Sequence, residues 1–179
     1  MASIELLQKI LEIYSPSGKE KPLALFLREE LERLGFLNVR IDKVGNVYGE
    51  VGSDSPTVLL CGHMDTVPGQ VPVSVVGSML YGRGAVDAKS SLAAMISAAS
   101  SLELGQRSGK VIVAAVVEEE RKAKGIYQLL REGLSIDCAI FGEPSGIKNI
   151  TFAYRGKLGL NVTFKTMSGH IGAQHLVDN

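Results

Sequence analysis

Residues 57–65 read TVLLCGHMD. The first five are apolar or β-branched, which predicts a short buried strand. The strand is followed at once by His63 and Asp65, so an imidazole and a carboxylate lie at its end. Ligands of open α/β sheets bind beyond the carboxyl ends of the strands. We therefore expect a ligand site at this point, and the residue types indicate a metal site.

Two more apolar runs follow, at residues 110–117 and 136–141. Residues 88–104 and 122–132, which lie between the three runs, have the spacing and composition of helices. This alternation of strands and helices predicts an α/β fold, in which a parallel sheet carries helices on its faces. Other patterns predict helices at 3–11 and 20–34, strands at 38–42, 47–50, 150–154 and 157–165, and a hairpin formed by 71–76 and 78–81.

Acidic residues lie at the ends of the other two strands as well. Glu118–Glu120 come directly after the second strand, and Glu143 follows the third. Asp87 precedes the helix at 88–104, and we expect it at the same edge of the sheet. Carboxylates crowded together repel one another and raise their pKa values, and a divalent cation relieves this repulsion. A His with several carboxylates suits zinc, cobalt or manganese better than calcium.

Each of these residues also has a simpler interpretation. A lone His after a strand, such as His63, is usually packed or solvated. Glu118–Glu120 could form the solvated N-terminus of the helix at 122–132, where carboxylates interact well with the helix dipole. Asp87 could cap the helix that follows it, and Glu143 could be an ordinary turn residue. The metal site is favoured because all of them fall at the ends of neighbouring strands.

The composition limits the class of protein. The 179 residues include 19 Lys plus Arg and 19 Asp plus Glu, so the charge gives no argument for binding to nucleic acid or to an anionic membrane. No apolar stretch is long enough to predict a membrane span, and the N-terminus lacks the basic start of a signal peptide. Cys61 and Cys138 lie in apolar runs, so we expect both to be buried and reduced, as in a cytoplasmic protein.

Four short motifs, taken in order, resemble the M20 family of metal-dependent amidohydrolases and peptidases. They are Gly62–Pro68, Leu80–Lys89, Glu118–Glu120 and Gly142–Ser145. The resemblance implies a three-layer αβα catalytic domain with a mainly parallel sheet, of the zinc-exopeptidase kind, and an inserted α+β lid or dimerisation domain. We expect residues 1–155 to be the N-terminal part of the catalytic domain and residues 156–179 to begin the lid.

The resemblance also implies roles for the residues at the sheet edge. His63 and Glu143 would hold one metal ion, and Asp87 would bridge it to a second. Asp65 would orient the imidazole of His63. The two ions are expected to be Zn²⁺ or Co²⁺, with the second site incomplete in this chain.

The remaining roles fall on the glutamate triplet and on a histidine near the end. Glu119 would be the general base and Glu120 a ligand of the second metal ion. The register is open by one residue, so Glu118 and Glu119 are the alternative pair. Ser168–His170 resembles a motif whose histidine, here His170, assists the oxyanion across a dimer.

Within the family, residues 15–20, residues 67–73 and the glutamate triplet are most similar to hydrolases that release lysine or ornithine from an amino-group carrier protein. This implies cleavage of an amide in an N-acylated amino acid or a carrier-linked precursor, by a protein that is a homodimer at full length. Acetylornithine deacetylase and succinyl-diaminopimelate desuccinylase are the alternatives in the same class. The chain ends at Asn179 without a further ligand histidine that the family has, so the alternative of another class is a truncated, catalytically silent metal-binding fragment.

Overall fold

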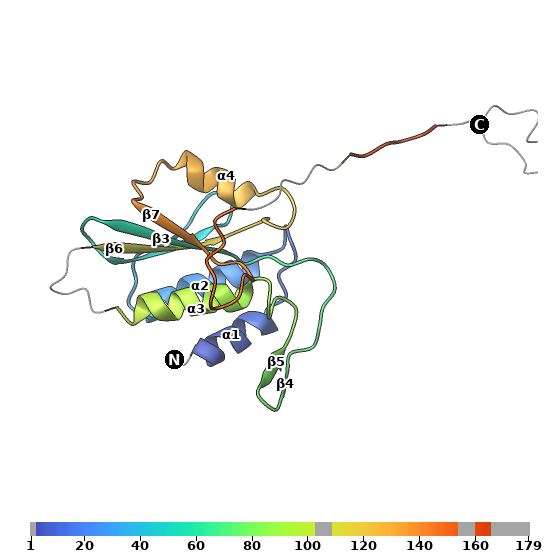
Figure 1. Ribbon diagram of the computed structural model, residues 1–179, viewed down its shortest axis with the longest axis horizontal. Helices are drawn as coiled ribbons and strands as arrows, with labels where there is room; N and C mark the ends of the chain where they lie inside the picture. Colours follow the sequence, from blue (N-terminus) through green and yellow to red (C-terminus); the bar gives the residue numbers. More distant parts are fainter. Residues whose placement is uncertain (1–2, 103–108, 154–159, 166–179) are drawn as a thin grey trace, which may run out of the picture. The chain divides into compact units, whose positions relative to one another are not determined.

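The strand predicted at residues 57–61 is two residues longer in the structure and includes His63. In the computed structural model, β3 spans Thr57–His63 and lies within a five-stranded sheet (Figure 1). Leu59 and Cys61 are buried, as expected for a strand inside a sheet. The sequence run that decides the fold therefore carries His63 on its last residue.

The structure describes residues 3–102, 109–153 and 160–165. The chain divides into two compact units, Met1–Pro144 and Ser145–Asn179, and the sheet belongs to the first. The remaining helices and strands are α1 (Ser3–Glu12), α2 (Lys21–Arg33), β1 (Leu37–Ile41), β2 (Val47–Gly52), β4 (Ser74–Val76), β5 (Met79–Tyr81), α3 (Lys89–Ser100), β6 (Lys110–Val116), α4 (Lys124–Arg131) and β7 (Cys138–Phe141).

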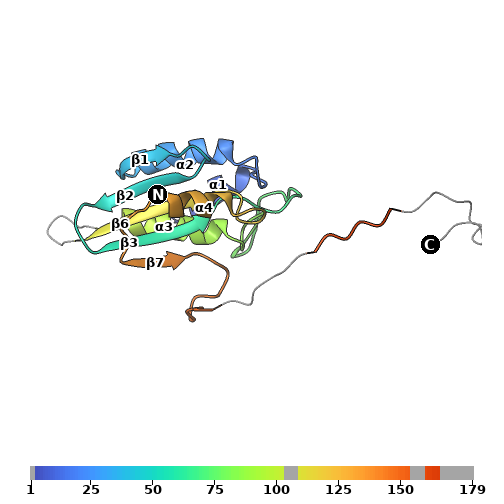
Figure 2. The ribbon, with the colours of Figure 1, turned by 90° about the horizontal axis from the view of Figure 1, so that it is seen from above.

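Four of the five strands in the described sheet point in the same direction. The strand order is β1-β2-β6-β3-β7 (Figure 2). β3 is parallel to β6 and β7, whereas β2 is antiparallel to β1 and β6. His63 pairs with Val116 on β6, and Cys61 pairs with Phe141 on β7. The mainly parallel sheet is thus confirmed, and β3, β6 and β7 end at one edge.

The helices cover both faces of the sheet. Figure 1 shows α1, α2 and α3 on one face and α4 on the other. The helix α3 leads from β3 to β6, and α4 leads from β6 past β3 to β7. The winding direction therefore reverses at β6, and the switch point lies between the neighbouring ends of β3 and β6. In doubly wound sheets, such a point is where ligands bind. The three-layer αβα architecture is confirmed.

Alternation along β6 separates two apolar cores. Val113 and Ala115 pack with the helices α1, α2 and α3, whereas Ile112, Ala114 and Val116 pack on the side of α4. Successive side chains of a strand point to opposite faces, so a continuous apolar run is what a strand covered on both faces requires. This explains why β6 lacks the polar alternation of a half-exposed strand.

The end of β7 lies very close to α3, and a glycine makes this possible. A Cβ atom on Gly142 would overlap with Cε of Met95 and would lie 2.8 Å from Cβ of Ser91. The main-chain N–H of Gly142 donates to the carbonyl oxygen of Cys61 at 2.8 Å. Gly142 therefore brings the following residue, Glu143, close to the end of β3.

Asn46 joins three elements from a fully buried position. Its Nδ2 donates to the carbonyl oxygen of Gly125 at 3.0 Å and to Oδ2 of Asp42 at 2.9 Å. Its Oδ1 accepts the main-chain N–H of Val117 at 3.0 Å. The amide thus fixes the start of β2, the end of β6 and the first turn of α4 relative to one another.

Two predicted strands near the C-terminus are not confirmed. The described parts of these segments, residues 150–153 and 160–165, form no strand. Their apolar side chains are exposed, with Phe152 at 96% and Phe164 at 85%. Alternating apolar residues indicate which face a strand would bury, but a strand also needs a hydrogen-bonded neighbour, and the described residues provide none for these segments.

The prediction that both cysteines are buried was wrong. Cys61 is buried, but Cys138 is exposed. The reason is that β7 is the last strand of the described sheet, and all four of its residues are exposed. The hairpin predicted from residues 71–76 and 78–81 is confirmed, but its strands β4 and β5 are shorter than predicted.

None of the helices in the described part of the chain has the length and apolar character needed to cross a membrane.

The substitution Asn46→Ala should lower the free energy of unfolding by roughly 1–3 kcal/mol, because it leaves the buried N–H of Val117 and carbonyl of Gly125 without partners. Urea unfolding of the purified chain measures this. Asn149→Ala is the matched control, since Asn149 is exposed, and it should stay within about 0.5 kcal/mol of the wild type. Equal losses in both variants would contradict the role of Asn46.

Candidate metal centre

His63 is the last residue of β3, and only 1% of its surface is exposed. Both ring nitrogens face oxygen atoms. Nδ1 lies 3.0 Å from the main-chain oxygen of Asp65, and Nε2 lies 3.0 Å from Oδ1 of Asp87. Burial alone would lower the pKa of the imidazole, but its interactions with Asp65 and Asp87 outweigh burial and raise the pKa to about 9. The surroundings therefore favour a positive charge at this position.

Asp65 is completely buried and organises the backbone around the site. Its carboxylate accepts hydrogen bonds from Oγ of Ser17 at 2.6 Å and from the main-chain N–H groups of Glu119 and Glu120 at 3.0 and 3.2 Å. Oδ1 also lies 3.5 Å from Nδ1 of His63. Burial disfavours the charged carboxylate, but these interactions outweigh it and hold the pKa of Asp65 below its usual range.

A second buried carboxylate, Glu20, holds the start of the glutamate triplet. Its Oε1 accepts the main-chain N–H of Gly18 at 2.9 Å and that of Glu118 at 3.1 Å. Glu118 has a φ of +53°, a conformation that costs energy for a residue with a side chain. Together with the two bonds to Asp65, every main-chain N–H of the triplet is therefore held by a buried carboxylate.

The structure brings three predicted metal ligands together. One donor atom each from His63, Asp87 and Glu143 lie within 4.8 Å of one another, and no other such group of three occurs among the described residues. One imidazole and two carboxylates suit a divalent ion such as zinc, and three protein ligands leave a further position for water or substrate. The positive charge that the surroundings favour at His63 agrees with this, so the donor set fits a metal ion.

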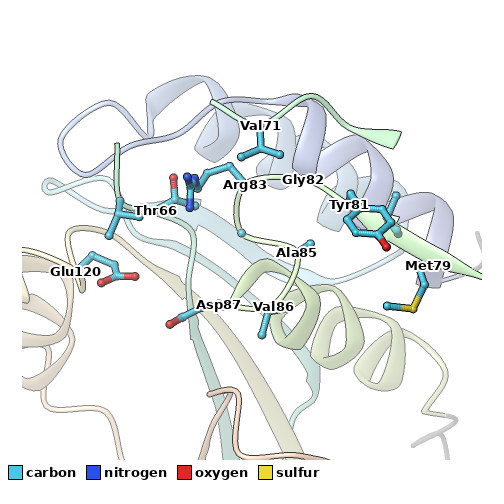
Figure 3. Close-up of a pocket in the computed structure, with 13 residues that line it drawn as sticks. Thr66, Val71, Met79, Tyr81, Gly82, Arg83, Ala85, Val86, Asp87 and Glu120 are labelled. Carbon is cyan, nitrogen blue, oxygen red and sulfur yellow. The ribbon is translucent and has the colours of Figure 1, made fainter. Parts of the chain in front are cut away.

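The other carboxylates at the edge make the local charge strongly negative. Burial raises the pKa of Glu143, and the charges of Glu119, Asp87 and Glu120 add to this, although His63 opposes them. Burial likewise raises the pKa of Glu120, and Asp87 contributes next. Such mutual repulsion is what a bound divalent cation relieves. Glu120 is not part of the three-residue group, but it lines the same cavity as Asp87 (Figure 3).

The side chain of Glu118 belongs to a different part of the surface. Its Oε1 lies 3.8 Å from Nζ of Lys124, and it lines a separate cavity together with Glu20. Of the two registers that the sequence left open, this geometry favours the one that uses Glu119 and Glu120.

The structure argues against the simpler interpretations of His63, of the glutamate triplet and of Asp87. His63 is neither solvated nor in purely apolar packing, because it faces two aspartates. The helix α4 begins at Lys124, several residues after the triplet, so Glu118–Glu120 do not form its N-terminus. The N-cap position of α3 is Ala88, and no side chain caps the helix, so Asp87 is not its cap. His170 lies outside the described residues.

Sequence reasoning missed several polar residues that support the site. Ser17 lies between the two predicted helices, and Glu20 lies at the start of the second, where it is the N-cap residue of α2. Residues 15–20 carry part of the family resemblance, but neither residue is assigned a role in the site from the sequence. Lys89 is buried, and its Nζ donates to the carbonyl oxygens of Ile10 and Ile13 at 3.0 and 2.8 Å, which fixes α1 against the start of α3. Burial lowers the pKa of Lys89 to about 8.

A cavity of about 680 Å³ opens beside Asp87 (Figure 3). Its walls come from the segment after β3, the hairpin β4–β5 and the turn that leads into α3. The predicted metal ligands Asp87 and Glu120 both line it. The candidate metal centre therefore borders a space large enough for a small substrate.

Comparison with known proteins identifies similar hydrolases. The [LysW]-lysine hydrolase of Deinococcus radiodurans is 40% identical over 172 residues, which are 94% of this chain and 47% of that protein. The [LysW]-lysine/[LysW]-ornithine hydrolase of Sulfurisphaera tokodaii is 39% identical over 166 residues, which are 93% of this chain and 46% of that protein. The chain thus spans about half the length of the curated relatives it matches.

A solved structure shares the fold. The M20 family metallo-carboxypeptidase Sso-CP2 from Sulfolobus solfataricus superposes with a TM-score of 0.67 at 23% identity, covering 79% of this chain and 37% of that one. A sequence model of Peptidase family M20/M25/M40 matches residues 59–169, which is more than half of the chain and includes His63, Asp87 and Glu143. With that match added to the metal-ligand geometry and the shared fold, the chain belongs to Peptidase family M20/M25/M40.

Proposed function

We propose that this chain provides the metal-binding half of a hydrolase that cleaves an amide bond and releases lysine or ornithine. The observation that carries the proposal is the convergence of His63, Asp87 and Glu143 at the ends of β3 and β7 and at the start of α3. The names of the relatives support the choice of lysine or ornithine as the released amino acid. The substrate is an N-acylated amino acid or a precursor linked to a carrier protein.

His63, Asp87 and Glu143 would hold one divalent cation, Zn²⁺ or Co²⁺, and Asp87 with Glu120 would contribute to a second. When bound, such an ion polarises the amide carbonyl and lowers the pKa of water. The main-chain oxygen of Asp65 accepts from Nδ1 of His63, and Nε2 therefore faces the metal ligand Asp87. This orientation makes Nε2 the donor atom of the imidazole.

Glu119 is the general base of the proposed reaction. Its main-chain N–H is fixed by Asp65, while its side chain is exposed at the edge where Glu120 and Glu143 lie. The carboxylate takes a proton from water and returns it to the leaving amine, so the net change is addition of water across the amide bond. The participation of His170 in stabilising the carbonyl oxygen stays a prediction.

The finer points of the proposal rest on the family and on the relatives. Acetylornithine deacetylase and succinyl-diaminopimelate desuccinylase activities are alternatives with the same chemistry. A carrier protein as partner, a homodimer at full length and a cytoplasmic location are proposed with it. The division into a catalytic part at residues 1–155 and the beginning of a lid at residues 156–179 stays a prediction.

After equilibration with zinc and desalting, the purified chain should retain about one zinc ion, and His63→Ala should lose it, because the imidazole is the most buried of the three ligands. Atomic absorption measures the stoichiometry. Glu118→Gln is the control and should retain zinc, since Glu118 pairs with Lys124 instead. Retention of zinc by the folded His63→Ala variant would refute the ligand assignment.

Glu119→Gln should lower the turnover of an acylated lysine by about a hundredfold or more and leave the zinc content unchanged, because it removes only the proton acceptor. Glu118→Gln should change turnover by less than about threefold, because the side chain of Glu118 faces Lys124 and is not among the three grouped metal donors. Loss of zinc along with activity would instead make Glu119 a ligand. A zinc-loaded wild-type chain without turnover would favour the catalytically silent alternative.

A further inference from the structure

The cavity beside Asp87 has two chemically different ends. Val71, Met79 and Tyr81 form apolar parts of its wall, and Asp87 and Glu120 supply carboxylates. In the view of Figure 3, Thr66, Arg83 and Glu120 lie toward one end, whereas Tyr81 and Met79 lie toward the other. A molecule with a polar end and an aliphatic stem matches this division. The polar groups at the first end decide which kind of molecule fits.

Thr66 contributes a hydroxyl group that has no partner among the described residues. The residue is 1% exposed, and it lines the cavity. Its main-chain N–H donates to the carbonyl oxygen of Ser15 at 3.0 Å, and its own carbonyl oxygen accepts from Ser17 at 3.2 Å. Only the hydroxyl is left unsatisfied. A buried hydroxyl without a partner is unfavourable. The oxygen has less than 1 Å² of accessible surface, so the side chain has to rotate for the hydroxyl to meet a ligand atom in the cavity.

Arg83 contributes a guanidinium group that is held in place from one side. Its Nε donates to the carbonyl oxygen of Gly69 at 2.6 Å, and the N–H of Gly69 donates to the hydroxyl of Tyr14 at 3.0 Å. Gly69 has a φ of +103°, a backbone conformation that favours glycine. The two terminal nitrogens have no carboxylate within 4.0 Å in the described chain.

A fixed guanidinium with free terminal nitrogens binds planar anions well. Two parallel N–H groups match the two oxygens of a carboxylate, and binding is favoured because the arginine does not have to be ordered first. After rotation of its side chain, the hydroxyl of Thr66 adds a third donor. A single guanidinium and one hydroxyl suit a singly charged carboxylate with an apolar remainder.

We propose that Arg83 and Thr66 bind the free carboxylate of the amino acid that the reaction releases, with its aliphatic stem along Val71, Tyr81 and Met79. This inference rests on the proposed function, since it concerns the substrate of the same site. It assigns to Arg83 and Thr66 a role in specificity: substrates with a carboxylate on the amine part are selected over simple amides of diamines.

The test compares L-lysine with cadaverine, which lacks only the carboxylate, by isothermal titration of the zinc-equilibrated chain near neutral pH. The carboxylates of Asp87 and Glu120 alone would favour cadaverine, because it carries the larger positive charge. We expect lysine to bind at least about tenfold more tightly than cadaverine, because a charge-assisted hydrogen bond to the carboxylate supplies a gain in affinity of this size. Equal affinities, or tighter binding of cadaverine, would overturn the proposal.

Two variants assign the preference to these residues. Arg83→Met should abolish the preference for lysine, because it weakens the binding of lysine and leaves the binding of cadaverine unchanged. Thr66→Val, which keeps the shape of the side chain, should reduce the preference for lysine. If Arg83→Met does not fold, this variant tests the assignment of the carboxylate site. Arg131→Met, a surface substitution at the end of α4, is the control and should keep the full preference. Equal weakening of both ligands by Thr66→Val would overturn the proposal.

The zinc content of the same samples separates the two hypotheses. Retained zinc without a preference for lysine contradicts only the carboxylate site. A preference for lysine without retained zinc supports the carboxylate site and contradicts the metallohydrolase. Repeating the titration after treatment with EDTA shows whether the preference needs the metal, which it should not, because neither Arg83 nor Thr66 is among the metal donors.

Discussion

A single buried anion, the carboxylate of Asp65, connects the parts of the candidate site. It receives the hydroxyl of Ser17 from the loop after α1 and two main-chain N–H groups from the triplet after β6, and it lies beside Nδ1 of His63. A buried charge is costly unless several donors surround it, so these segments are held together. Glu20 acts in the same way on Glu118. The backbone is thereby fixed, while Asp87 and the carboxylates of Glu119 and Glu120 remain exposed to a ligand.

The sequence predicts the features that depend on local pattern. Three apolar runs identify three strands, which are followed by His63, by the glutamate triplet and by Glu143. The helices predicted between these strands require that the strands are parallel and end at one edge of the sheet. Because strand direction decides which ends meet, this pattern alone brings His63 and Glu143 together. The structure has this arrangement, and Asp87, which the sequence also predicts at this edge, lies beside the other two.

The supporting contacts could not be predicted because they join residues far apart in the chain. Asn46 lies between two predicted strands, yet its side chain accepts a hydrogen bond from Val117, 71 positions later. Ser17 lies between two predicted helices, yet its hydroxyl donates to the carboxylate of Asp65. Burial is equally non-local: Cys138 lies in an apolar run like that of Cys61, but its strand is at the edge of the described sheet. Alternation at residues 160–165 indicates a strand but does not supply its partner.

The central claim is that His63, Asp87 and Glu143 bind one metal ion. A crystal structure of the zinc-equilibrated chain, with anomalous scattering recorded at the zinc edge, tests this directly. The account predicts an anomalous peak about 2.0–2.2 Å from Nε2 of His63 and within bonding distance of the carboxylates of Asp87 and Glu143. A peak at another position, or a zinc ion whose ligands exclude the imidazole of His63, would contradict it.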